Sequence, residues 1–251
     1  MSFSAVILAG SRGGAVDAVA EAEGVSHKAL ISVDGRTMLE RVADAVRAAG
    51  AQTVAVSAND PAVIAVAQAL SLRVLPPAAG PSDSVATAVA GLGTPLLVTT
   101  ADHALLEPEW ITSFLHDVPA GADIAVLLAE RARIEAAMRD TRRTYLRFAD
   151  GAWSGCNLFY LATSDAARAI GLWRAVEADR KRPWRIVRRF GVGTLLRYLT
   201  GRLTLADAVA RLGRTADVRA AAVAARDGLA AVDVDKLSDL ADVRAIIANR
   251  R

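Results

Sequence analysis

Apolar and polar positions in the first 130 residues follow two alternating periods. Short runs of consecutive apolar residues predict buried strands at residues 6–9, 53–57, 73–75, 95–99 and 123–128. Between these runs, apolar residues recur every three or four positions and predict helices at residues 37–49, 61–70, 84–92 and 108–115. Strands that alternate with helices of about ten residues are typical of right-handed βαβ units and a mostly parallel sheet. Ligands of such sheets bind beyond the carboxyl ends of the strands.

The pattern changes after residue 128. The predicted elements are, in order, strands at 145–148 and 157–161, a helix at 164–176, two short helices within 195–212, a strand at 231–234 and a helix at 238–248. Asp150-Gly151 is a strong turn pair, so the first two strands should form an antiparallel hairpin. The two short helices should break near Thr200-Gly201. Because the last strand and helix return to the earlier pattern, we expect a single domain over residues 1–251.

Composition and charge narrow the class of protein. The chain has 251 residues, of which 53% are hydrophobic, so it can bury a sizeable core. No stretch reaches the roughly 18 apolar residues of a spanning helix, and the N-terminus lacks the features of a signal peptide. A single cysteine, Cys156, excludes an internal disulfide, and we expect a cytoplasmic protein. The net charge of +3 is compatible with anionic ligands but is too small to indicate a nucleic-acid partner.

The first predicted strand ends in a glycine-rich loop, Gly10-Ser11-Arg12-Gly13-Gly14, and Lys28 follows downstream. Backbone N–H groups of such a loop can form an anion-binding concavity, and an arginine can clamp phosphate oxygens. The spacing matches neither the dinucleotide-binding fingerprint nor the P-loop. A plain strand-to-helix turn that needs glycine is the alternative, and the loop alone does not decide between the two.

Aspartates follow two further predicted strands. Asp102 ends the apolar run of residues 95–99, where a carboxylate can hold Mg²⁺ on phosphates or simply cap a turn. Asp233 and Asp235 alternate on the last predicted strand, so we expect them on opposite faces, with only one completing a metal site beside Asp102. Ser238 or Asp235 is then expected to cap the last helix. His103 is expected to be structural.

Taken in order, these segments resemble the nucleotidyltransferases related to the molybdenum-cofactor guanylyltransferase. The matching segments are Leu8-Ala9-Gly10-Ser11-Arg12-Gly13, His27-Lys28-Ala29-Leu30-Ile31, Val33-Asp34-Gly35-Arg36-Thr37-Met38-Leu39, Gly80-Pro81-Ser82-Asp83-Ser84-Val85, Ala101-Asp102-His103 and Asp233-Val234-Asp235-Lys236-Leu237-Ser238-Asp239-Leu240. The loop departs from the family in lacking Arg-Met-Gly and in the longer run to Lys28. This departure implies that backbone groups hold more of the triphosphate than they do in the relatives.

The resemblance implies an α/β, single-domain fold like that of the nucleotide-diphospho-sugar transferases (GT-A-like), a three-layer sandwich with a mixed, mostly parallel sheet. Residues 1–128 would be the nucleotide-binding half, 129–230 an acceptor-binding elaboration, and 231–251 the returning strand and C-terminal helix. The implied reaction transfers an NMP group from an NTP, GTP or CTP, to a phosphorylated small-molecule or lipid-precursor acceptor, with release of pyrophosphate.

The resemblance also assigns roles to particular residues. Lys28, Arg12 and Asp102 would be catalytic, and Asn157 would contact the acceptor. Mg²⁺ would be held by Asp102 together with Asp233 or Asp235. The nucleotide would be bound by Leu8, Ala9, Gly10, Ser11, Arg12, Gly13, Gly14, Lys28 and Ser84.

Several interpretations remain open beside this one. A nucleotide-sugar-dependent glycosyltransferase would share the fold, but such enzymes usually carry Asp-x-Asp where this chain has Asp102-His103-Ala104. A non-catalytic nucleotide-binding protein is a second alternative. The basic segment Arg180–Arg189 could meet an anionic acceptor or make a weak peripheral contact with an anionic membrane, or it could be a solvated basic face.

Overall fold

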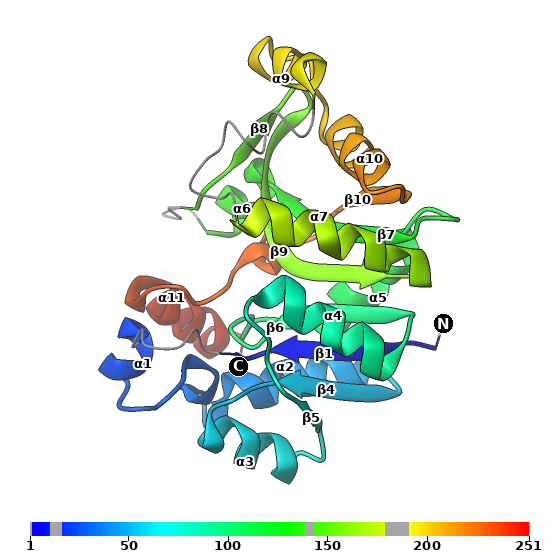
Figure 1. The fold of residues 1–251 in the computed structure, drawn as a ribbon. Coiled ribbons are helices and arrows are strands. Elements are labelled where there is room, and N and C mark those ends of the chain that lie inside the picture. Colours follow the sequence, from blue (N-terminus) through cyan, green and yellow to red (C-terminus); the bar gives the residue numbers. More distant parts are fainter. Residues whose placement is uncertain (1, 11–16, 139–142, 179–190, 251) are drawn as a thin grey trace.

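A mixed β-sheet with helices on both faces forms the body of the molecule (Figure 1). The computed structural model describes residues 2–10, 17–138, 143–178 and 191–250. The strands of the main sheet are β1 (Ser4–Leu8), β4 (Thr53–Ser57), β5 (Arg73–Leu75), β6 (Leu96–Thr100), β7 (Ile124–Glu130), β8 (Leu146–Phe148), β9 (Gly151–Leu161) and β10 (Ala220–Ala224). A separate two-stranded sheet pairs β2 (Ser32–Val33) with β3 (Arg36–Thr37).

The helices occupy the connections that the apolar periodicity predicted, with additions. They are α1 (Ala18–Ala22), α2 (Met38–Ala48), α3 (Pro61–Ala69), α4 (Pro81–Leu92), α5 (Pro108–Asp117), α6 (Arg131–Ala137), α7 (Ala167–Ala178), α9 (Val192–Leu199), α10 (Leu205–Thr215) and α11 (Leu237–Ala248). Short 3₁₀ turns are η1 (Lys28–Leu30), η2 (Ser164–Ala166) and η3 (Gly228–Ala231). α4 begins three residues earlier than expected, with Pro81 in its first turn. Proline is tolerated there because the first N–H groups of a helix have no hydrogen-bond partner within the helix.

The order of the main sheet is β10-β7-β9-β6-β1-β4-β5, with β8 paired to β9. β1 runs parallel to β4 and β6, and β10 runs parallel to β7. β9 lies between β6 and β7 and is antiparallel to both. The predicted mixed, mostly parallel sheet is therefore confirmed, and its antiparallel member is the long second strand of the predicted hairpin.

Two hydrophobic cores cover the two faces of this sheet. Along β1, Ala5 and Ile7 face the larger core, whereas Val6 faces the smaller one. Residues of α2, α5 and α11 fill the larger core, and residues of α4 and α7 fill the smaller one. Figure 1 shows α4 and α7 on the near side of the sheet. The result is the three-layer sandwich that the sequence predicted.

The carboxyl ends of three central strands meet at one edge of the sheet. Leu8 of β1 is in register with Ser57 of β4 and with Thr100 of β6. The segments that follow these strands therefore start side by side, and Ala101 N donates to Leu8 O at 3.0 Å. Gly10, which follows β1, and Asp102, which follows β6, both lie at this edge, which is where ligands of parallel sheets bind.

The antiparallel hairpin continues beyond the sheet into a projecting arm, which we define as β8, the start of β9, α9 and α10 (Figure 1). Its two helices confirm the predicted break, and Gly201 between them has a φ of 64° that suits glycine. The basic segment 180–189 lies outside the described residues.

The strand expected at residues 231–234 is wrong. The returning strand is β10, an alanine-rich run at 220–224 that the apolar pattern did not reveal. Residues 228–231 instead form η3, and the segment after it carries no strand pairing, because Val234 N donates to Asp102 O at 3.1 Å rather than to a neighbouring strand. No helix among the described residues is long and apolar enough to cross a membrane.

We expect Gly228→Ala to destabilise the protein by at least about 2 kcal/mol. A Cβ at this position would lie 2.2 Å from Arg133 O and 2.6 Å from Ile134 N, so backbone would have to move. In α7, Gly171 offers a matched control, since its added Cβ meets nothing within 4 Å and alanine favours helix. Urea unfolding of both variants checks this, and a Gly228→Ala free energy of unfolding equal to that of the wild type would contradict it.

Candidate active site

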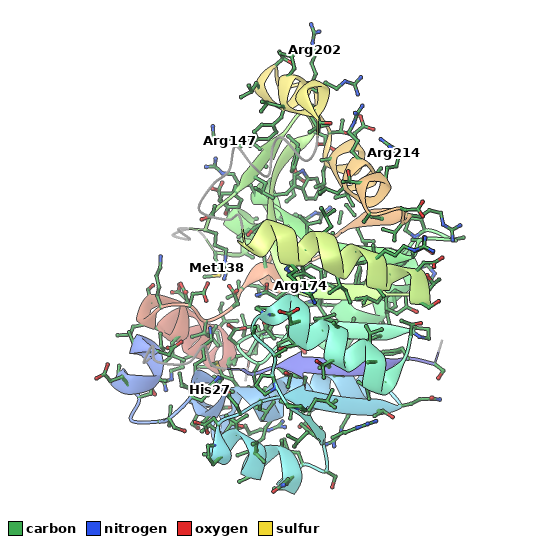
Figure 2. The ribbon with its side chains drawn as sticks, in the orientation of Figure 1. His27, Met138, Arg147, Arg174, Arg202 and Arg214 are labelled. Atoms are coloured by element: carbon green, nitrogen blue, oxygen red, sulfur yellow. The ribbon has the colours of Figure 1, made fainter. Side chains whose placement is uncertain are left out.

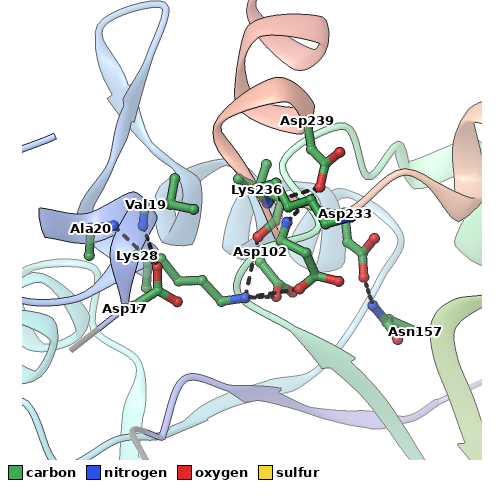
Figure 3. A network of polar contacts seen from close by, with 12 residues as sticks. Asp17, Val19, Ala20, Lys28, Asp102, Asn157, Asp233, Lys236 and Asp239 are labelled. Carbon is green, nitrogen blue, oxygen red and sulfur yellow. Dashed lines mark hydrogen bonds and ion pairs between the residues drawn. The ribbon is translucent and has the colours of Figure 1, made fainter. Parts of the chain in front are cut away.

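An ion pair between Lys28 and Asp102 marks the centre of the candidate site (Figure 3). Lys28 is the first residue of η1. The neutral ring of His27 caps this turn by accepting a hydrogen bond from Ala29 N at 3.0 Å. Burial lowers the pKa of His27, which keeps that ring neutral. Lys28 Nζ lies 2.5 Å from Asp102 Oδ2 and also donates to Val234 O at 3.3 Å. The lysine therefore joins η1, the end of β6 and the segment before α11.

Two more carboxylates converge on this pair. One oxygen from each of Asp102, Asp233 and Asp235 lies within 4.8 Å of the others, and Lys28 Nζ lies 3.5 Å from Asp235 Oδ1. The expectation that Asp233 and Asp235 point to opposite faces is wrong, because the segment between them is not a strand. We call these three residues the carboxylate cluster.

The turn that carries Asp235 is closed by Asp239. Its Oδ2 accepts from Asp235 N at 3.0 Å and from Lys236 N at 2.9 Å, just before the first turn of α11. A carboxylate in the first turn of a helix is favoured by the helix dipole. Asp239 therefore does the capping that we expected of Ser238 or Asp235, and it leaves the Asp235 carboxylate facing the cluster.

Arg143 and Asn157 hold the two oxygens of Asp233. Arg143 donates to Asp233 Oδ1 at 2.7 Å, and Asn157 Nδ2 donates to Asp233 Oδ2 at 2.7 Å. Asn157 adopts a left-handed φ of 50° where the pairing of β9 with β7 shifts register, so the irregularity aims its side chain out of the ladder. Sequence reasoning selected Asn157 as an acceptor contact but missed Arg143, which no motif marked.

The charged groups of the site are the three carboxylates of the cluster and two cations, Lys28 and Arg143. Burial opposes the charged form of Lys28, but Asp102 and Asp235 outweigh it and raise the pKa of the lysine. Burial and the neighbouring Asp233 carboxylate raise the pKa of Asp235. One negative charge of the cluster is left without a compensating cation, which favours binding of a metal ion.

The oxygen atoms of the carboxylate cluster are suited to binding a divalent cation. Asp102 is 8% exposed, and its Oδ1 is buried without a hydrogen-bond partner among the described residues. Carboxylate oxygens are the ligands that Mg²⁺ prefers, and an orphaned buried oxygen needs a partner. The predicted donor set Asp102, Asp233 and Asp235 therefore fits Mg²⁺, with all three carboxylates in reach rather than only two.

Two clefts meet at the carboxylate cluster. The glycine cleft, of about 460 Å³, is lined by Leu8, Ala9, Gly10, Lys28, Ser84 and Asp102 among others. The hairpin cleft, of about 630 Å³, is lined by Arg143, Ser154, Asn157, Asp233, Asp235 and Lys236 among others. Because Lys28 and Asp102 belong to one cleft and Asp233 to the other, a group held in each cleft would face the other across the cluster.

The predicted nucleotide-binding residues that the structure describes gather in the glycine cleft. Gly10 packs so closely that a Cβ would lie 3.1 Å from Pro77 Cβ, which explains why glycine stands there. Ser84 Oγ accepts from Ala78 N at 3.0 Å and so braces the opposite wall. Ser11, Arg12, Gly13 and Gly14 lie outside the described residues.

His103 has the structural surroundings that the sequence predicted. Its ring is 1% exposed and stacks against Trp110 with ring centroids 6.1 Å apart. Burial lowers the pKa of His103 to about 4, so the ring is neutral at physiological pH.

The sheet thus carries an acidic cluster at its carboxyl edge with two clefts around it, and comparison with known proteins identifies the class as nucleotidyltransferases. The model of the MobA-like NTP transferase domain matches residues 5–224. A hypothetical transferase from Thermus thermophilus is 34% identical, covers 96% of this chain and 100% of its own, and has a TM-score of 0.83. This chain belongs to the family of MobA-like NTP transferase domains and is a nucleotidyltransferase, acting on a nucleoside triphosphate and a small-molecule acceptor.

More distant structures share the fold of the nucleotide-diphospho-sugar transferases. A nucleotidyl transferase from Methanothermobacter thermautotrophicus is 21% identical over 100% of this chain and 99% of its own, with a TM-score of 0.59. The 2-C-methyl-D-erythritol 4-phosphate cytidylyltransferase from Thermus thermophilus is 16% identical over 99% of this chain and 100% of its own, with a TM-score of 0.54. Among curated proteins, none matches this sequence significantly.

We expect Asn157→Gly to weaken divalent-metal binding by about tenfold or more, because it frees one oxygen of Asp233. Glycine is the chosen replacement because it tolerates the φ of 50° at this position. Thr144→Ala, which alters the same cleft without touching the cluster, is the control. Titration with Mn²⁺, followed by electron paramagnetic resonance, measures both, and equal affinities for the two variants would refute a supporting role for Asn157.

Proposed function

We propose that this protein transfers the NMP group of GTP or CTP to a phosphorylated acceptor, with release of pyrophosphate and a requirement for Mg²⁺. The observation that carries the proposal is the carboxylate cluster at the junction of the glycine and hairpin clefts. A transfer between two substrates needs both to face one point, and the cluster is the point that the two clefts share.

The nucleotide occupies the glycine cleft in this proposal. Leu8, Ala9, Gly10 and Ser84 line the side for base and ribose, and Lys28 stands at the end nearest the cluster. Arg12 and the loop amides of Ser11 to Gly14 hold the β- and γ-phosphates, as the family resemblance implies. The cytidylyltransferase among the structures of the same fold supports CTP as one of the two candidate nucleotides.

The acceptor occupies the hairpin cleft. Arg143 and Lys236 supply positive charge there, and Asn157 and Ser154 supply polar side chains, which suits a phosphate group. A phosphorylated small molecule and a phosphorylated lipid precursor present this same group, so the proposal covers both. The single cysteine agrees with a cytoplasmic location for such an enzyme.

The chemistry asks for positioning and charge neutralisation. A phosphate oxygen of the acceptor attacks the α-phosphorus, a bond forms between them, and the bond from the α-phosphorus to the bridging oxygen of pyrophosphate breaks. Lys28 stabilises the charge that develops on the α-phosphate oxygens. Mg²⁺, when held by Asp102, Asp233 and Asp235, supplies further neutralisation of the phosphates. The acceptor phosphate needs no general base, because its oxygen is already ionised at neutral pH.

We expect Asp102→Ala to lower kcat/KM by at least about a hundredfold, equivalent to about 2.7 kcal/mol of transition-state stabilisation. Pyrophosphate release measures the rate, with each NTP, Mg²⁺ and a pool of phosphorylated metabolites. Asp117→Ala is the matched control. Asp117 is the last residue of α5, pairs with Arg226 and lies outside both clefts. Turnover of Asp102→Ala near that of the control in Mg²⁺ would end the assignment of the cluster.

A further inference from the structure

Large apolar side chains are exposed together on the arm. Among the described residues, five large hydrophobic side chains are exposed, and four of them, Leu146, Leu196, Tyr198 and Leu199, belong to β8 or α9. Leu196 is 61% exposed and Leu199 is 70% exposed, and their spacing of three puts them on one face of α9. A gathered apolar patch of this kind marks an interaction surface, whereas single exposed leucines are ordinary.

Two contacts pack α9 and the chain after it against the hairpin of β8 and β9. The rings of Phe148 and Tyr198 meet edge to face with centroids 6.1 Å apart, and Ala149 N donates to Leu203 O at 2.8 Å. β8 and α9 therefore form a single packed unit, and each contributes exposed apolar side chains. We call this surface, made of Leu146, Leu196, Tyr198 and Leu199, the arm patch.

The arm patch is surrounded by positive charge. Residues 146–153 and 191–215, which make up the arm, contain five arginines, Arg147, Arg197, Arg202, Arg211 and Arg214, but only two carboxylates, Asp150 and Asp207. Arg147 and Arg202 are exposed on the arm, as Figure 2 shows, and Arg197 pairs only at 3.9 Å with Asp207. Apolar side chains on an arm of net positive charge match the surface of a bilayer that carries anionic headgroups.

We propose that the arm patch docks on an anionic membrane surface, with Leu196 and Leu199 entering the headgroup region and Arg147 and Arg202 contacting lipid phosphates. A second copy of the chain fits the patch less well, because pairing two arms would bring together two surfaces of net positive charge. The proposal does not depend on the reaction proposed above, since it concerns a surface outside both clefts.

The position of the arm suits such docking. Figure 1 shows α9 at the end of the molecule opposite α3 and β5, so a plane could touch the arm without approaching the glycine cleft. The same hairpin that carries the arm patch carries Asn157 of the hairpin cleft at its other end, on β9. Membrane docking would hold the acceptor side of the molecule towards the bilayer and leave the nucleotide side in solution.

Vesicle co-sedimentation of the full-length protein tests this proposal. We expect binding to phosphatidylcholine vesicles with about 30% phosphatidylglycerol and not to pure phosphatidylcholine, at about 50 mM salt. Leu196→Ser with Leu199→Ser should lower the partition coefficient about tenfold. The control is Leu237→Ser on α11, which removes a leucine that is 52% exposed but lies away from the arm.

The contribution of the arginines to vesicle binding is tested with two double variants. The double variant Arg147→Gln with Arg202→Gln should weaken vesicle binding. The control is Arg47→Gln in α2 with Arg73→Gln in β5, at the opposite end of the molecule. The control changes the net charge by the same amount and should leave vesicle binding unchanged. Thermal unfolding confirms that all variants fold. Absence of binding to anionic vesicles at about 10 mM salt would overturn the proposal, as would equal effects of the arm and control substitutions. A dimer that dissociates in Leu196→Ser with Leu199→Ser, without any vesicle binding, would assign the patch to a second copy instead.

Discussion

The mutual repulsion of three carboxylates is the constraint around which this structure is arranged. Asp102, Asp233 and Asp235 bring oxygens within 4.8 Å of one another in partly buried surroundings, where like charges are costly. Lys28 contacts Asp102 and Asp235, and Arg143 contacts Asp233, so two positive charges face three negative ones. The fold must therefore deliver two cations to the same point, from segments far apart in the sequence. The energetic cost of gathering these charges is what makes the site receptive to a cation.

The topology of the sheet brings these distant segments together. Parallel strands β1, β4 and β6 end at one edge, and the ion pair of Lys28 with Asp102 ties η1 to the segment that follows β6 there. The segment before α11 is then tied to the same edge by the hydrogen bond from Val234 N to Asp102 O, and by the bond from Lys28 Nζ to Val234 O. Lys28 thus contributes its charge and also fixes the backbone that carries Asp233 and Asp235.

β9 links the site to the rest of the molecule. Its C-terminal half pairs with β6 and β7 inside the sheet, and its N-terminal half extends into the arm. The change of register against β7 falls between these halves and turns Asn157 towards Asp233. One strand therefore contributes to the hydrophobic core, to the geometry of the carboxylate cluster and to the exposed arm. Such a strand couples the position of the arm to the hairpin cleft through covalent structure alone.

Sequence by itself determined most of the elements and selected residues that the structure brings together at one site. Buried strands, helix periods and the Asp150-Gly151 turn are local signals, because they depend on residues a few positions apart. Lys28, Asp102 and the Asp233–Asp235 segment were selected from their order along the chain, and the structure brings them into contact. Family membership followed from the same order.

Only the tertiary structure decided how these parts meet. β10 escaped prediction because a run of alanines carries a weak strand signal, and its pairing with β7 displaced the strand expected at 231–234. Arg143 could not be chosen from the sequence, because its role depends on Asp233, ninety positions away. The same holds for the shared orientation of Asp233 and Asp235, which the contacts of Val234 and Asp239 impose. Local patterns define elements, whereas long-range contacts define which side chains face one another.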